Sequence, residues 1–151
     1  MNRAEKAEEY FLKGYACSQA VFLAFADLAH IDEETASKIS LPLGGGVGRM
    51  RSICGALTGM ALAIGGIFAE ADGDAENKLQ VYAIVQELLG KFKEEYGTLI
   101  CKELLEGKVK VEVGGNPENR TETYYQKRPC SKLVYRAAEI LENYLIERGI
   151  I

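Results

Sequence analysis

Apolar positions recur at intervals of three and four along most of the chain, and this spacing places them on one face of an α-helix. The segment at 17–29 is apolar on nearly every side, which predicts a helix buried at the centre of the fold. In the segment at 75–96, an apolar stripe predicts a core-facing side formed by Leu79, Tyr82, Val85, Leu89, Phe92 and Tyr96. The pattern predicts helices at about 3–13, 17–29, 33–40, 53–69, 75–96, 98–106 and 129–148.

One part of the chain departs from helical spacing. Residues 108–113 alternate between apolar and polar, residues 114–119 have turn composition, and residues 120–125 favour strand. This order predicts a small β-hairpin. No repeat or linker interrupts the chain, so we expect a single all-α domain over residues 1–151, a bundle of about six or seven helices with a small β-hairpin or loop excursion near 108–125.

Composition narrows the function classes. The chain has 151 residues, 48% hydrophobic and 26% charged, which is enough for one sizeable core. A formal net charge of −4 argues against nucleic-acid binding. The N-terminal segment alternates charges without an apolar stretch, so we expect a cytoplasmic protein. The uncharged run at 53–69 is at the lower limit for a membrane helix, and we expect a buried core helix with no membrane span.

The four cysteines are Cys17, Cys54, Cys101 and Cys130, and no two of them form a Cys-x-x-Cys motif. Each falls within about one turn of a predicted helix start, where free N–H groups and the helix dipole favour a thiolate. If consecutive helices are antiparallel, the second, fourth and sixth begin at one end of the domain. The excursion before the last helix lets Cys130 return to the same end. We therefore expect the four sulfurs to converge.

Converged thiols admit two kinds of chemistry. Four thiolates can ligate an iron–sulfur cluster or zinc, which makes all four cysteines candidate metal ligands as well as candidate catalytic residues. Alternatively, a pair such as Cys54 and a neighbour can cycle between dithiol and disulfide. A third interpretation is a non-catalytic helical binding or dimerisation module in which the cysteines are small buried hydrophobes.

A glycine-dense loop at 44–51 precedes the fourth predicted helix. Gly45 and Gly46 supply flexible backbone, and Arg49 and Arg51 supply guanidinium groups, so the loop is a candidate site for an anionic cofactor or small ligand. It fits neither the dinucleotide-binding pattern nor the P-loop pattern. The other interpretation is that these glycines allow left-handed turns and close packing beside a cysteine.

Four segments together resemble the C_GCAxxG_C_C family of redox-active proteins; they are GYACSQAV at 14–21, GGG at 44–46 leading to CGALTG at 54–59, YGTLICKELL at 96–105 and CSKLV at 130–134. The resemblance implies redox chemistry or a metal or iron–sulfur group, with Cys17, Cys54, Cys101 and Cys130 as the functional positions. It leaves open whether the chain is an oxidoreductase or an electron-transfer protein, and which redox partner or small ligand it meets. A homodimer also stays open. With no Cys-x-x-Cys-His motif, c-type haem is not expected.

Overall fold

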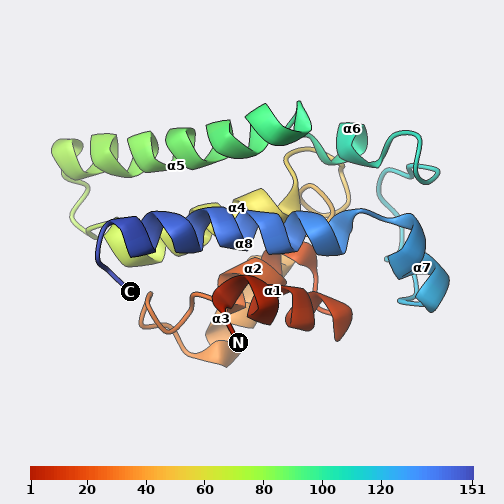
Figure 1. Cartoon of the computed structure of the whole chain (residues 1–151), viewed down its shortest axis with the longest axis horizontal. Coiled ribbons are helices and arrows are strands. Elements are labelled where there is room, and N and C mark those ends of the chain that lie inside the picture. Colours follow the sequence, from red (N-terminus) through yellow and green to blue (C-terminus); the bar gives the residue numbers. More distant parts are fainter.

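All of the regular structure is helical in the computed structural model, which describes residues 1–151 (Figure 1). A single 3₁₀ turn, η1 (Leu41–Leu43), follows the third helix. The eight α-helices are α1 (Arg3–Leu12), α2 (Cys17–Leu23), α3 (Glu33–Ser40), α4 (Gly55–Phe68), α5 (Ala75–Tyr96), α6 (Cys101–Leu105), α7 (Glu122–Lys127) and α8 (Cys130–Glu147).

Helices α2, α4 and α8 form the centre of the core. Residues 18–26, which include most of α2, are all buried, as the uniformly apolar pattern predicts. Helix α4 buries seven of its residues, so the prediction of a core helix at 53–69 is confirmed. Two glycines let the helices approach closely: a Cβ at Gly59 would come within 2.5 Å of the Ser18 carbonyl oxygen, and one at Gly66 would meet the Ala29 side chain.

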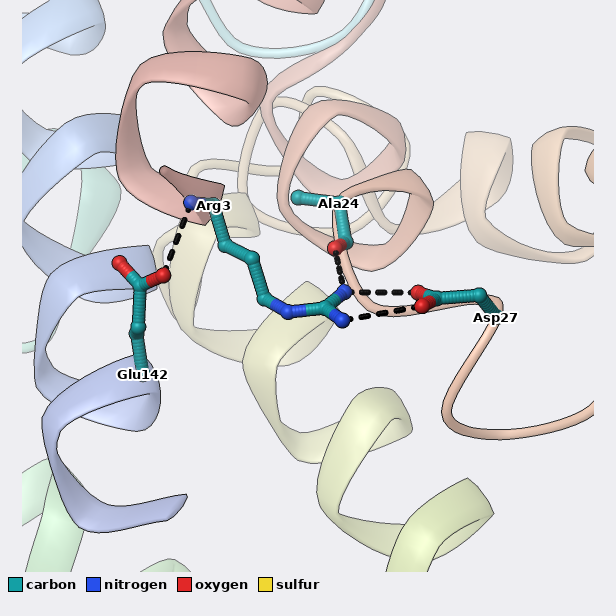
Figure 2. Close-up of polar contacts among 4 residues, drawn as sticks. All are labelled: Arg3, Ala24, Asp27 and Glu142. Atoms are coloured by element: carbon teal, nitrogen blue, oxygen red, sulfur yellow. Dashed lines mark hydrogen bonds and ion pairs between the residues drawn. The ribbon is translucent and has the colours of Figure 1, made fainter. Parts of the chain in front are cut away.

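The first helix is fastened to the others at its N-terminus by Arg3 (Figure 2). The Arg3 guanidinium pairs with both carboxylate oxygens of Asp27, at 2.7 and 2.9 Å, and donates to the Ala24 carbonyl at 2.7 Å. The Arg3 backbone N–H donates to Glu142 of α8 at 2.9 Å. A single residue thus joins α1 to the end of the α2 segment and to α8.

The predicted hairpin at 108–125 is wrong, although the all-α class holds. Residues 108–121 form a loop and residues 122–127 form α7, which makes eight helices in place of six or seven. The loop forms hydrogen bonds with the glycine-dense segment in place of a strand pairing: the Gly114 N–H donates to the Arg49 carbonyl, and Arg51 Nε donates to the Glu112 carbonyl. The Thr121 side chain caps α7 by accepting from the Tyr124 N–H, which favours a helix over a strand.

The predicted core stripe of α5 is only partly buried. Of its six residues only Phe92 is buried, whereas Leu79 is 69% exposed and Tyr82 is 57% exposed. The other buried residue of α5, Leu88, lies outside the predicted stripe. Helix α5 lies along one side of the molecule (Figure 1), and the exposed Leu79 and Tyr82 both belong to its first half. No helix is long and apolar enough to cross a membrane.

Candidate functional site

All four cysteines stand at the first turn of a helix. Cys17, Cys101 and Cys130 are the first residues of α2, α6 and α8, and Cys54 is the N-cap residue of α4. All four line one cavity of about 480 Å³. The predicted convergence of the sulfur-bearing segments is therefore confirmed, and none of the cysteines is joined in a disulfide.

A short antiparallel bridge brings two of the cysteines together. Ile53 pairs with Ile100, and each of these residues directly precedes a cysteine. The Cys54 N–H donates to the Leu99 carbonyl at 2.8 Å, and the Cys101 N–H donates to the Ser52 carbonyl at 2.6 Å. The bridge fixes the starts of α4 and α6 side by side. It is too short to produce an alternating strand pattern, so the sequence gives no signal for it.

Gly55 sets the position of Cys17. A Cβ atom at Gly55 would collide with the Sγ atom of Cys17, so the sulfur lies directly against the start of α4. This contact explains the glycine that follows Cys54: only a residue without a side chain leaves room for the sulfur. Thr58 in the same motif donates to the Gly55 carbonyl at 3.1 Å and stays within its own helix.

The glycine-dense loop lies beside Cys17, and most of its residues between 45 and 51 have positive φ. Arg49 and Arg51 have φ of 65° and 61°, and both side chains line the cavity. Gly45 also lines it; a Cβ there would lie 3.0 Å from Arg49 Cα and Cγ, so this glycine makes room for Arg49. Gly46 is outside the lining and packs against the backbone of Arg51 and Ser52. Three of the four candidate ligand-binding residues of this loop, Gly45, Arg49 and Arg51, therefore line the cavity.

Burial raises the pKa of three of the thiols. The pKa of Cys130 rises to about 12, and that of Cys54 rises well above its usual value, with the neighbouring Cys17 adding to the burial effect. Burial also raises the pKa of Cys17, against hydrogen bonds from the backbone of Gly45 and Ser18. Helix N-termini alone therefore do not keep these three sulfurs ionised, contrary to the expectation from their position.

Cys101 accepts a hydrogen bond from an arginine, whereas no such bond reaches the other three cysteines. Arg51 Nη1 lies 3.7 Å from Cys101 Sγ and donates a hydrogen bond to it, while Arg51 Nε is held by the Glu112 carbonyl at 2.9 Å. A guanidinium beside a sulfur stabilises negative charge on it. Cys101 is therefore the one thiol of the four that accepts a hydrogen bond from a guanidinium group.

Arg120 and Arg128 also line the cavity, although neither was among the candidate residues in the sequence. Arg120 donates to the carbonyls of Phe11 and Tyr15 at 3.1 and 3.0 Å. Arg128 is buried and pairs with Glu118 at 2.5 Å. The place of Arg128, two residues before Cys130, is a signal that could have revealed it; Arg120 has no comparable signal.

The sulfurs share a cavity without forming a ligand set for one metal ion. No three His, Cys, Asp or Glu side chains are grouped as a metal site in this structure. Zinc and iron–sulfur centres require three or four such ligands around the metal. The arrangement seen here does not fit either group, and the metal-ligand role of the cysteines stays a prediction.

Residues 15–144 match a protein family described as "Putative redox-active protein (C_GCAxxG_C_C)". The chain belongs to the C_GCAxxG_C_C family. The match spans all four cysteines and the glycine-dense loop, and it confirms the resemblance seen in the sequence. No curated protein and no solved structure matches the chain. The family assignment therefore rests on the match over residues 15–144.

Proposed function

We propose that this C_GCAxxG_C_C protein is a thiol redox protein in which Cys101 and Cys17 exchange with a disulfide substrate inside the cavity. The observation that carries the proposal is the common cavity: four unpaired thiols from four different helices line it. The family description supports chemistry of the same class.

Cys101 is the attacking sulfur in this proposal because Arg51 Nη1 donates to it at 3.7 Å. Cys17 is the resolving sulfur. It lies against Gly55 at the start of α4 and lines the same cavity as Cys101. Negative charge on Cys101 raises the pKa of Cys17, which places the two sulfurs within electrostatic reach of each other. Cys54, which the sequence offered as one member of an exchanging pair with an unnamed neighbour, is buried without a hydrogen bond from an arginine and is the weaker nucleophile.

The exchange oxidises the protein and reduces the substrate by two electrons. The Cys101 thiolate attacks one sulfur of the substrate disulfide, the S–S bond breaks, and one substrate thiolate leaves and takes up a proton. Cys17 then loses its proton and attacks Cys101 Sγ in the mixed disulfide, which releases the second substrate thiol. The products are one Cys17–Cys101 disulfide and two substrate thiols.

A single-turnover experiment tests this proposal. The fully reduced protein is mixed with bis(2-hydroxyethyl) disulfide, and free thiols and disulfide-linked peptides are measured by mass spectrometry. We expect the loss of two protein thiols and a peptide pair containing Cys17 and Cys101. The Cys101→Ser variant is expected to form no disulfide, and Cys17→Ser is expected to stop at a mixed disulfide on Cys101.

Two results would contradict the proposal. Linkage of Cys54 to Cys130 as the first product would show that a different pair exchanges. Four unreactive thiols, together with a loss of stability alone when all four are replaced by alanine, would favour a helical module with structural cysteines.

A further inference from the structure

The cysteine-lined cavity is strongly positive in a protein whose overall charge is −4. Its ionisable lining, apart from the cysteines and Tyr124, comprises four arginines and a single carboxylate, Glu118, so these groups carry a net charge of +3. Lysine and aspartate are absent from the lining. Such a concentration of guanidinium groups in a half-open, partly apolar cavity attracts anions and disfavours cations.

Three of the four arginines are held by the protein itself. Arg51 bonds to the Glu112 carbonyl and to Cys101, Arg120 bonds to two carbonyls at the end of the α1 segment, and Arg128 pairs with Glu118. Hydrogen bonds therefore hold these three guanidinium groups in fixed positions on the cavity lining. They need no rearrangement when an anion binds.

Arg49 differs from the other three. Its Nε and Nη2 atoms are buried and have no hydrogen-bond partner. Leaving buried charged donors unpaired costs free energy, and these two N–H groups form the side of the guanidinium that binds two oxygens of one carboxylate or phosphate. The backbone of Arg49 is held in place as well. Its φ is 65°, its N–H donates to the Gly44 carbonyl, and its carbonyl accepts from the Gly114 N–H.

We infer that the substrate of this cavity is a small anionic disulfide, whose carboxylate, or an equivalent oxyanion group, is bound by the Arg49 guanidinium while its sulfur faces Cys101. A volume of about 480 Å³ suits a small molecule. The disulfide half of this inference rests on the proposed function. The anion half stands on the cavity and Arg49 alone.

Binding is tested with probes that cannot exchange. Thiodiglycolate, a thioether with two carboxylates, is compared with its neutral analogue thiodiglycol and with inorganic phosphate by calorimetry on the reduced protein. We expect at least one anion to bind and thiodiglycol not to bind. The Arg49→Gln variant is expected to weaken anion binding by roughly 10- to 100-fold, because a charge-assisted pair is lost.

Controls separate a lost site from a damaged fold. Arg148→Gln removes the same charge from the exposed C-terminal end of α8, outside the cavity, and we expect unchanged anion binding. Arg49→Lys keeps the charge but removes the two-pronged geometry, and we expect intermediate affinity. Equal binding by wild type and both Arg49 variants, or binding of neither anion, would overturn the inference.

Reactivity separates this inference from the proposed function. Single-turnover rates are compared for dithiodiglycolate, bis(2-hydroxyethyl) disulfide and cystamine, which are anionic, neutral and cationic. We expect the anion to react fastest, the cation slowest, and Arg49→Gln to lower only the anion's rate. Equal rates for all three disulfides would overturn the anionic substrate and leave the redox function standing. Reaction with none of the three, alongside anion binding that depends on Arg49, would overturn the redox function and with it the disulfide half of this inference, and would leave the anion half standing.

Discussion

Gly55 is the residue on which the position of Cys17 depends. Replacing it with alanine places a Cβ atom in collision with Cys17 Sγ. We expect Gly55→Ala to lower the free energy of unfolding by about 1–3 kcal/mol, because the sulfur or the helix must move. We also expect faster alkylation of Cys17 by iodoacetamide as the sulfur leaves its buried position. Urea unfolding and site-resolved mass spectrometry measure the two effects.

The matched control for Gly55→Ala is Gly65→Ala in the same helix. No atom lies within 4 Å of a Cβ at Gly65, so alanine is expected to stabilise α4 by about 0.5–1 kcal/mol. Equal effects of the two substitutions would show that Gly55 is not selected by the contact with Cys17.

The protonation of Cys130 gives a prediction about pH. Burial raises the pKa of this thiol to about 12 from an ordinary value of 9.0. Because the thiolate is the reactive form, its alkylation rate should keep rising through pH 10, where an exposed cysteine has levelled off. The native state also holds this proton more tightly than the unfolded chain. Its contribution to stability is therefore present below about pH 9 and is lost as the pH rises towards 12.

Site-resolved alkylation between pH 7 and pH 11 measures this profile. A short unfolded peptide containing the same cysteine supplies the reference. A plateau for Cys130 in the folded protein below pH 9.5 would contradict the prediction.

At the scale of the element, the glycine-dense loop stores strain in residues that are not glycine. Val47 has φ of 67°, a conformation that strongly disfavours a β-branched side chain, and it is 42% exposed. Relief of strain of about 1–3 kcal/mol should exceed the entropy cost of a new glycine, about 0.5–1 kcal/mol. We therefore expect Val47→Gly to raise the free energy of unfolding by about 1 kcal/mol, measured by urea denaturation.

Val113→Gly is the control for Val47. Val113 is also an exposed loop valine, but its φ is not positive, so glycine relieves nothing there and should lower stability by about 0.5–1 kcal/mol. A loss of stability in both variants would show that the loop does not hold Val47 under strain.

The helices and their cysteine-bearing starts were predictable because periodicity and caps are local signals. Asp32 accepts from the Thr35 N–H at the start of α3, and Gly97 ends α5 at φ of 81°. The hairpin was wrong because the loop at 108–121 finds its partners in Arg49 and Arg51, some 60 residues away. Arg120 is placed at the cavity by hydrogen bonds to Phe11 and Tyr15, 109 and 105 residues away, which no local pattern contains.

At the scale of the whole molecule, stability is unevenly distributed between the centre of the bundle and α5. Eight residues of α8 are buried, whereas α5 buries only Leu88 and Phe92 in its 22 residues, and none among residues 75–86. Segments with few buried apolar contacts open at lower free energy than the global unfolding of the protein. The first half of α5 should therefore open while the cysteine-lined cavity, built on α2, α4, α6 and α8, stays intact.

Hydrogen–deuterium exchange followed by mass spectrometry tests this difference. Amides at 79–86 of α5 are expected to exchange at least roughly tenfold faster than those at 133–144 of α8, since the two helices differ in burial and not in backbone hydrogen bonding. The amides of α4 at 58–64 serve as a second protected reference, because that part of the helix lies in the core. Equal protection of all three segments would contradict the prediction, because it would mean that α5 opens only when the whole bundle unfolds.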